Sequence, residues 1–396
     1  MMPSGRRGPR YDFHVVEATS ISLPGLLRLA GMADTVRAAV QAAPGVIEVR
    51  EFPRPVIGPD DGLLRVEANG VCGSDVEIYR GHLRPMGQEG GGPVPFVAGH
   101  EPMGVVEEIG DRASERWGVR PGDRVAVEII VPCHACRRCL TGHYQSCPNR
   151  RHAHGATGID VEPSLWGGLA EYMYLSPGSI VHPIDPALPA EVAALFNPMG
   201  AGVRWACHLG GVGLGDTVLV LGAGQRGLCS VVAARAAGAG AIIVTGLASD
   251  ARKLALAREF GADHTIVADE EDTVARVREI TGGDLADVVL ELTPMAGGPV
   301  TDALLSARHG GRVVLAGLKG DREIPLRTDL IVNRALTVVG AFGVDHRAYR
   351  EAVALIESRR YALERMHTHS FGLEETARAI ETLGGDTTAI HVSVHP

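Results

Sequence analysis

The sequence has few aromatic residues, no long apolar run and no excess of positive charge. Phe, Trp and Tyr make up 4% of its 396 residues, so aliphatic side chains must fill most of the core. No apolar run approaches the roughly 18 residues of a membrane-spanning helix, which predicts a protein without a membrane partner. The formal net charge of -9 argues against nucleic-acid binding, because phosphate contacts require clustered Lys and Arg.

The N-terminus also lacks an apolar segment of the kind found in signal peptides. Basic residues stand near its start, but the stretch that follows mixes His14 and Glu17 with other polar residues. We therefore expect a cytoplasmic protein. Residues 1–31 show no clear periodicity and predict a largely disordered N-terminal extension, with Met32 as the effective start.

The composition is typical of a globular protein with more than one domain. Hydrophobic residues make up 45% and charged residues 21% of the chain, which is too long for one ordinary core. From 32 to 185, short strand-like segments alternate with turns such as Pro44-Gly45, which predicts a β-rich domain. From 186 to 340, apolar strand-like runs alternate with helix-like stretches and predict a parallel, doubly wound sheet. The fold class is therefore α/β. Residues 341–396, with two helices and a final strand, return to the β-rich domain.

Four of the seven cysteines follow the pattern Cys-x2-Cys-x2-Cys-x7-Cys. They are Cys133, Cys136, Cys139 and Cys147. In a reducing compartment, such a cluster favours metal binding over disulfides. Three thiolates at this spacing can surround a tetrahedral ion, and the fourth returns after a short loop. Four thiolates leave no position for a substrate, so the pattern predicts a structural zinc ion.

A second set of metal-binding residue types comes from two separate segments. Cys72 lies in Gly70-Val71-Cys72-Gly73-Ser74-Asp75, and His100 and Glu101 follow Gly99. One thiolate, one imidazole and one carboxylate could hold a metal with one position open, as Lewis-acid catalysis requires. Taken alone, Cys72 also fits a core cysteine and His100 a surface histidine, so both interpretations stay open at this point.

The glycine-rich segment Gly222-Ala223-Gly224-Gln225-Arg226-Gly227 follows the apolar run at 217–221 and opens a helix-like stretch. This context is that of a dinucleotide-binding loop. Its first glycine makes the turn, its second lets a pyrophosphate approach the backbone, and its third allows the helix to pack on the strand. The free N–H groups of the helix N-terminus then bind phosphate. A purely structural glycine loop is the alternative.

In their order and spacing, these three signals resemble the zinc-containing medium-chain dehydrogenase/reductase family, in particular its polyol and threonine dehydrogenase branch. The resemblance covers the chain from about residue 34 to the C-terminus. It also includes the segments Gly99-His100-Glu101-Pro102-Met103-Gly104, Pro121-Gly122-Asp123-Arg124-Val125 and Gly168-Leu169-Ala170-Glu171-Tyr172. It implies a GroES-like β-rich catalytic domain (32–185 plus 341–396), a Rossmann-type cofactor domain (186–340) and a homodimer or homotetramer.

The resemblance also implies roles for single residues. Cys72, His100 and Glu101 would bind a catalytic zinc ion, which makes two zinc ions per chain. Asp75 would orient His100 through its other ring nitrogen. Ser74 matches the hydroxyl residue that passes the substrate proton outward. The implied activity is hydride transfer between an alcohol, polyol or amino-alcohol substrate and NAD(P).

Several positions depart from the family pattern. Asn197 stands where relatives carry a Glu or Cys near the zinc ion, and its amide could donate a hydrogen bond to a substrate hydroxyl or merely cap the helix that follows. Glu77 stands where threonine dehydrogenases usually carry a histidine, which weakens the threonine interpretation. We expect Glu171 to support its loop rather than to bind metal, and Trp166 to narrow the active-site cleft.

The cofactor is predicted from the end of the second strand of the doubly wound sheet. A carboxylate there would bind the ribose hydroxyls of NAD and repel a 2′-phosphate, but the position is Gly246. Ser249, Arg252 and Lys253 follow closely and could meet a phosphate. These residues favour NADP. The alternative is NAD, with Asp250 turned towards the ribose.

Two other classes of function fit parts of the pattern. A zinc-free quinone or enoyl reductase would lack both sets of zinc ligands, whereas this sequence has both. A non-catalytic dinucleotide-binding protein would keep the fold without turnover, and Asn197 is the one feature that points to it.

Overall fold

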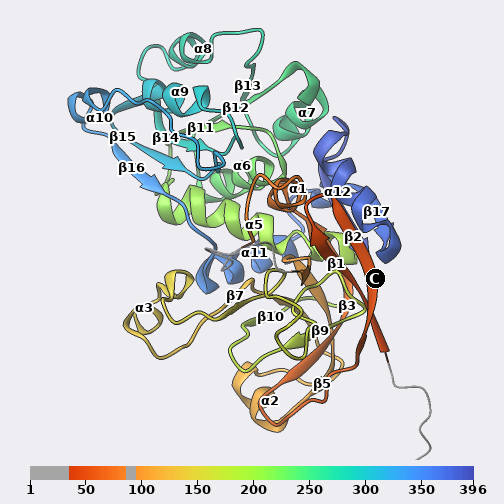
Figure 1. The fold of residues 1–396 in the computed structure, drawn as a ribbon. Helices are drawn as coiled ribbons and strands as arrows, with labels where there is room; N and C mark the ends of the chain where they lie inside the picture. Colours follow the sequence, from red (N-terminus) through yellow and green to blue (C-terminus); the bar gives the residue numbers. More distant parts are fainter. Residues whose placement is uncertain (1–34, 86–94) are drawn as a thin grey trace, which may run out of the picture. The chain divides into compact units, whose positions relative to one another are not determined.

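The structure, a computed structural model, describes residues 35–85 and 95–396, and the predicted extension at 1–31 lies outside the described residues. The β-rich part forms a three-stranded sheet, β2-β1-β4, and a larger sheet, β10-β6-β5-β3-β18-β17 with β9 paired to β3 (Figure 1). The strand pairs in these two sheets are antiparallel except for the parallel pair β17–β18. The predicted turn between β1 and β2 is present, with Gly45 at a φ of 73°.

The strands of these two sheets are β1 (Thr35–Ala43), β2 (Val46–Pro53), β3 (Gly62–Val71), β4 (Phe96–Val97), β5 (Pro102–Ile109), β6 (Arg124–Val127), β9 (Tyr172–Leu175), β10 (Val181–Pro183), β17 (His367–Gly372) and β18 (His391–His395). The short strands β7 (Ile130–Val131) and β8 (His152–Ala153) pair with each other.

The six-stranded sheet is wholly parallel and has the order β13-β12-β11-β14-β15-β16. Counted from β11, this is the strand order 3-2-1-4-5-6 of a Rossmann sheet, which confirms the predicted doubly wound fold. Its strands are β11 (Thr217–Leu221), β12 (Ala241–Gly246), β13 (His264–Val267), β14 (Ala286–Glu291), β15 (Ala307–Leu315) and β16 (Thr337–Gly340). Its helices are α6 (Gln225–Ala237), α7 (Ala251–Glu259), α8 (Thr273–Ile280), α9 (Gly298–Ser306) and α10 (Asp329–Asn333).

The remaining helices belong to the other parts of the chain. They are α1 (Gly73–Tyr79), α2 (Asp111–Trp117), α3 (Arg137–Leu140), α4 (Ala190–Ala193), α5 (Phe196–Val203), α11 (His346–Glu357) and α12 (Thr376–Gly385). A π-helical segment (Arg204–Leu209) continues α5. Short 3-10 turns are η1 (Tyr144–Ser146), η3 (Ala248–Asp250), η4 (Leu363–Met366) and η5 (Leu373–Glu375). No helix of the described residues is both long and apolar enough to span a membrane.

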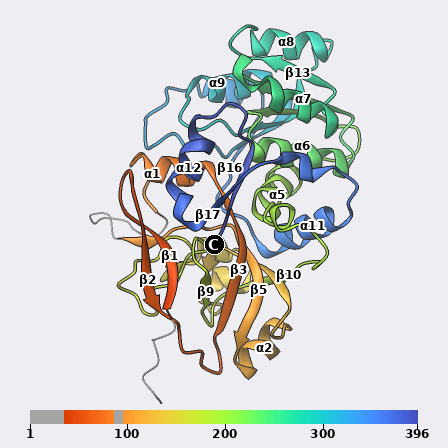
Figure 2. The same ribbon diagram turned by 90° about the vertical axis from the view of Figure 1, so that its right-hand side faces the viewer.

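The C-terminal strands β17 and β18 join the antiparallel sheet next to β3, as Figure 2 shows. The antiparallel sheets therefore combine strands from 35–183 and from 367–395, and the parallel sheet uses 217–340. All strands fall on the expected sides of the domain limits at 186 and 340, which themselves stay predictions.

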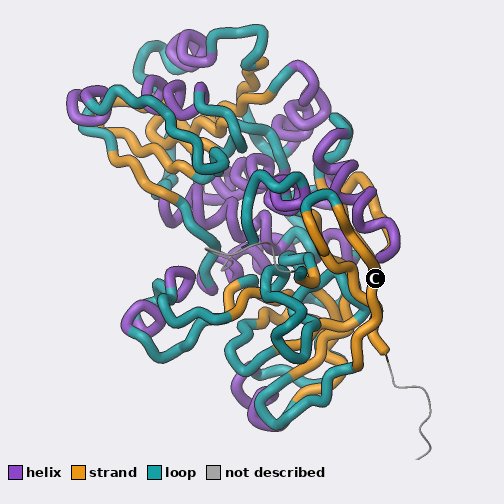
Figure 3. The backbone as a smooth tube through the Cα atoms, in the orientation of Figure 1, coloured by secondary structure: helices purple, strands orange, loops and turns teal. Residues whose placement is uncertain are grey.

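Helices α5, α6 and α11 lie between the two large sheets (Figure 3). All eight residues of α5 are buried. Gly202 allows α5 to approach α6 closely, because a Cβ added there would lie 2.6 Å from the backbone carbon of Cys229. This packing brings side chains of α5 and α6 together beside the ends of β3 and β5.

Candidate active site

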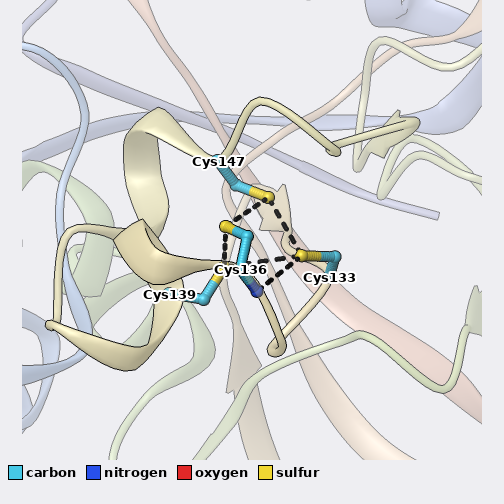
Figure 4. Close-up of side chains that lie close together, drawn as sticks. All are labelled: Cys133, Cys136, Cys139 and Cys147. Carbon is cyan, nitrogen blue, oxygen red and sulfur yellow. Dashed lines mark hydrogen bonds between the residues drawn. The ribbon is translucent and has the colours of Figure 1, made fainter.

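The four clustered cysteines face one another from the loop after β7, α3 and the turn η1 (Figure 4). Their Sγ atoms are 3.5 Å apart in the pairs Cys136–Cys139 and Cys133–Cys147, and 3.9 Å apart in the pairs Cys133–Cys139 and Cys136–Cys147. Zn–S bonds of about 2.3 Å in a tetrahedron place sulfur atoms about 3.8 Å apart, whereas a disulfide brings them to about 2.05 Å. All four cysteines are free. This donor set fits zinc.

The surroundings of Cys133 favour a thiolate. The backbone N–H groups of Ala135 and Cys136 lower the pKa of the Cys133 thiol to about 6. The Asn149 amide also donates to this sulfur, at 3.6 Å. Zinc is bound by thiolates rather than thiols, so the hydrogen bonds of this loop favour the form of Cys133 that binds zinc.

The second predicted ligand set is also brought together. Candidate ligand atoms of Cys72, His100 and Glu101 all lie within 4.8 Å of one another. Cys72 follows β3 directly and caps the N-terminus of α1, and the other two residues precede β5. The structure thus joins residues that the sequence separates.

Glu101 provides the test of whether a metal fits this site. Its side chain is fully buried, and its Oε2 atom has no hydrogen-bond partner. Its Oε1 atom lies 3.5 Å from Nη2 of Arg226, and burial raises the pKa of the Glu101 carboxyl. Leaving a buried carboxylate oxygen unsatisfied costs free energy, which a divalent cation between it, the thiol and the imidazole would remove. The residues therefore fit a zinc ion.

His100 is oriented as a ligand by Asp75. The carboxylate of Asp75 lies 3.0 Å from Nδ1 of His100 and accepts a hydrogen bond from the backbone N–H of Cys72 at 2.9 Å. This contact leaves Nε2 of His100 pointing into the site. Burial lowers the pKa of His100, but the charges of Asp75 and Cys72 raise it by more, so the pKa lies well above its usual value. Because a metal ion binds the neutral ring, metal affinity at this site should depend on pH.

Ser74 lies between the two ligand atoms. Its Oγ atom is 3.1 Å from Sγ of Cys72 and 3.4 Å from Nε2 of His100. A hydroxyl can both donate and accept a hydrogen bond, so this side chain is able to hold or pass on a proton beside these two atoms.

The glycine loop has the predicted strand–turn–helix context. Gly222 ends the strand with a φ of 109°, and Gly224 caps α6. A Cβ on Gly227 would lie 2.0 Å from the carbonyl oxygen of Gly222, so no side chain fits there. Gln225 donates to the carbonyl oxygen of Val71 at 3.1 Å. The loop is therefore tied directly to the end of β3, one residue before Cys72.

The segment after β12 holds the residues predicted to select the cofactor. Gly246 is the last residue of this strand. Asp250 accepts a hydrogen bond from the backbone N–H of Leu247 at 3.0 Å and pairs with Nζ of Lys253 at 2.8 Å. Arg252 donates to the carbonyl oxygen of Thr388 at 3.4 Å, and Ser249 is exposed. The Asp250 carboxylate is therefore held by the turn that follows the strand, through Leu247, and by Lys253 of the next helix.

Comparisons with known proteins agree with this geometry. The alcohol dehydrogenase GroES-like domain model matches residues 58–186, and the zinc-binding dehydrogenase model matches residues 227–358. A Mycobacterium tuberculosis protein named "probable alcohol dehydrogenase" is 45% identical, over 89% of this chain and 95% of its own. The chain belongs to the zinc-containing medium-chain alcohol dehydrogenase family.

Two further relatives support the assignment. Erythritol/L-threitol dehydrogenase of Mycolicibacterium smegmatis is 32% identical over 92% of this chain and 98% of its own. The NADP-bound crystal structure of a Sinorhizobium meliloti zinc-binding dehydrogenase has a TM-score of 0.80 and 28% identity, covering 92% of this chain and 100% of that one. This dehydrogenase is therefore an NAD(P)-linked, zinc-dependent oxidoreductase that acts on CH–OH groups.

Asn197 of this dehydrogenase does not cap its helix. The N-cap residue of α5 is Leu195, and Asn197 lies inside the first turn, so the capping alternative is wrong. Its side chain is fully buried and donates to the hydroxyl of Tyr349 at 3.2 Å and to the carbonyl oxygen of His100 at 3.5 Å. Its Oδ1 atom accepts from Arg226 at 3.4 Å. Asn197 therefore connects α5, α6 and α11 at the metal site.

The structure also shows contacts that sequence reasoning missed. By sequence Arg226 belongs to the cofactor loop, but its guanidinium group contacts Glu101 and Asn197 and lies 5.6 Å from the centre of the Trp205 ring. Tyr349 is 152 residues from Asn197 in the sequence, and no motif marks it. Only the packing of the three helices reveals both contacts.

Two expectations about surrounding residues have opposite outcomes. Glu171 accepts hydrogen bonds from the backbone N–H of Arg37 at 2.9 Å and from its guanidinium group at 2.8 Å, which confirms a supporting role. The expectation that Trp166 narrows a cleft is wrong, because its side chain is buried, stacks on His152 at 4.5 Å and donates to the carbonyl oxygen of Val161.

Proposed function

We propose that this dehydrogenase oxidises a small polyol or a related secondary alcohol, with two zinc ions per chain and NADP as the preferred cofactor. The buried, unpartnered Oε2 atom of Glu101, beside Cys72 and His100, supports the catalytic zinc most directly. The four clustered cysteines (Cys133, Cys136, Cys139 and Cys147) support the structural zinc ion. We also propose a homodimer or homotetramer.

Each side chain of the site has a separate role in the proposed reaction. When bound, zinc supplies a Lewis acid for the substrate oxygen, and NAD(P) accepts the hydride. Cys72, His100 and Glu101 hold the metal, and Asp75 fixes the His100 ring. Ser74 takes the proton of the substrate hydroxyl at its Oγ atom and passes it outward.

Polyols fit the side chains around the site better than threonine does. Glu77, at the position of the threonine dehydrogenase histidine, pairs with His82 at 2.7 Å and with Arg80 at 3.3 Å, so it is committed to its own loop. The relative from Mycolicibacterium smegmatis acts, by its name, on erythritol and L-threitol. Because both amide hydrogens of Asn197 are directed to protein oxygens, we assign this residue to positioning rather than to substrate binding.

A substrate panel tests the proposal. Purified enzyme is assayed with four- to six-carbon polyols, simple alcohols and amino alcohols, with NAD and with NADP, by the absorbance of the reduced cofactor. We expect the highest kcat/KM with a polyol. Turnover of threonine above all polyols would overturn the substrate class, and no turnover of any CH–OH compound would favour a non-catalytic protein.

The cofactor preference is tested by Gly246→Asp. A carboxylate at this strand end binds ribose hydroxyls and repels a 2′-phosphate. We expect the NADP/NAD ratio of kcat/KM to fall by at least about tenfold, equivalent to about 1.4 kcal/mol. A Cβ at this position would lie 3.0 Å from the side chain of Leu254, so Gly246→Ala provides the steric control without the charge. A wild-type enzyme that strongly prefers NAD would contradict the prediction.

Replacement of Asn197 tests its positioning role. Asn197→Ala leaves Arg226 and Tyr349 without their shared partner, at a cost of about 1–3 kcal/mol in the free energy of unfolding. We expect both zinc ions to remain and kcat/KM to fall by at least about tenfold. Tyr349→Phe removes only one of these contacts and should have a smaller effect. Unchanged kinetics in Asn197→Ala would show that the contacts serve stability alone.

A further inference from the structure

A third group of potential metal ligands, here called the His–carboxylate cluster, consists of Glu128, His182 and His346. One ligand atom from each lies within 4.8 Å of the other two. Glu128 directly follows β6, His182 lies in β10, and His346 is the first residue of α11. The cluster therefore joins the antiparallel sheet to the helix that returns from the Rossmann domain.

The geometry of the cluster centres on one carboxylate oxygen. Oε1 of Glu128 is 2.8 Å from Nε2 of His182 and 3.6 Å from Nδ1 of His346. The two imidazole rings lie 4.8 Å apart, centre to centre. Two ring nitrogens from different elements thus face the same oxygen atom.

The cluster also has the surroundings of a metal site. The Glu128 side chain is 1% exposed, and its second oxygen, Oε2, accepts a hydrogen bond from the Tyr144 hydroxyl. Ligating carboxylates are commonly held in this way by a further hydrogen bond. The His346 side chain is 49% exposed, so an ion and water can reach the cluster from one side.

A buried hydrogen bond between Glu128 and His182 is the simpler interpretation. It accounts for these two residues but not for His346, because 3.6 Å is too long for a direct hydrogen bond. A metal ion accounts for all three. Bonds of about 2.0–2.2 Å from zinc to nitrogen and oxygen place tetrahedral ligands about 3.3–3.5 Å apart. The distances of 2.8 and 3.6 Å lie on either side of this range.

We propose that Glu128, His182 and His346 bind a third zinc ion, with solvent in the remaining position. Two neutral imidazoles and one carboxylate are a ligand set suited to Zn²⁺, and they leave one net positive charge at a solvent-accessible place. The Glu128–His182 pair would have to open by about half an ångström, and the Glu128–His346 pair would close by only about a tenth of an ångström.

A zinc ion here would hold α11 against the sheet. The same helix carries Tyr349, whose ring lies 5.5 Å from the His182 ring and whose hydroxyl accepts the hydrogen bond from Asn197. The ion would therefore stabilise the placement of Tyr349 beside the active site. Its ligands are shared with neither of the other two zinc sites, so its occupancy can be measured separately.

The test compares zinc binding by the full-length wild type and His346→Gln. Both are equilibrated by dialysis against the same free zinc concentration, and bound zinc is measured by elemental analysis. We expect the wild type to hold one equivalent more than His346→Gln, and added zinc to raise the Tm of the wild type only. His264→Gln, which replaces an exposed histidine of β13, is the control and should bind as the wild type does.

The result depends on a difference between variants, so it does not depend on whether the other two sites fill. His346 is largely exposed, and its replacement should leave the fold intact; His182→Gln, at the buried ligand, should remove the same equivalent. Equal zinc content in the wild type and His346→Gln would overturn the proposal, as would equal loss in His264→Gln.

Discussion

Cys72→Ala is expected to abolish turnover while leaving the protein folded. The thiolate is one of three ligands of the proposed catalytic zinc, and Ser74 also makes its contact to this sulfur, at 3.1 Å. Without the metal, the substrate hydroxyl loses its activation, and we expect kcat/KM to fall at least about a thousandfold, or about 4 kcal/mol.

The controls for Cys72→Ala separate metal loss from misfolding. Bound zinc should fall by one equivalent, and the Tm should fall moderately without loss of the fold, because the substitution removes both the cap of α1 and one bound ion. Cys207→Ala changes a cysteine outside both zinc sites and should keep full activity and zinc content. A Cys72→Ala enzyme that keeps its zinc and more than about a tenth of its kcat/KM would show that the metal is bound elsewhere.

Cys136→Ser is expected to unfold the loop at 133–147. This loop contains the four-residue helix α3, none of whose residues is buried, and Leu140 is 74% exposed. Within the loop Tyr144 and Cys147 are the buried hydrophobic residues, so it has a small core of its own, and we expect metal binding to supply much of its folding free energy. Structural zinc contributes up to about 10–16 kcal/mol in isolated zinc-finger peptides.

The effect of Cys136→Ser is measured by zinc content and limited proteolysis. We expect the loss of one zinc equivalent, rapid cleavage within the loop and a lower Tm, with Cys207→Ser behaving as the wild type. An unchanged zinc content in Cys136→Ser, together with protease resistance, would mean that three thiolates suffice or that no ion binds there.

The parallel sheet could be predicted well from sequence because buried parallel strands are continuous apolar runs. The runs Val218-Leu219-Val220-Leu221 and Val288-Val289-Leu290 are of this kind and lie in β11 and β14. β17 was missed, since His367-Thr368-His369-Ser370-Phe371-Gly372 is largely polar and becomes a strand only by pairing with β18. Tertiary pairing overrides local pattern in such a segment.

The four cysteine ligands could be predicted because their residue type and their spacing within one short segment are visible in the sequence. Thiols at three-residue spacing indicate a metal site by residue type and spacing alone, whereas Cys72 was assigned as a ligand only through the resemblance to the family. The contacts of Asn197 were not predictable in the same way. Its partners Arg226 and Tyr349 are 29 and 152 residues away, and α5 begins at Phe196, one residue before Asn197.

The most direct test of the account is the rate of cofactor reduction on the best polyol as zinc is restored to the stripped enzyme. A chelator removes the zinc ion of Cys72, His100 and Glu101 while the four-cysteine site stays filled, as judged by elemental analysis and circular dichroism. We predict that the stripped enzyme is inactive and that the rate returns in proportion to the zinc bound by Cys72, His100 and Glu101, with no recovery in Cys72→Ala. Undiminished turnover by the folded, stripped protein would contradict the account.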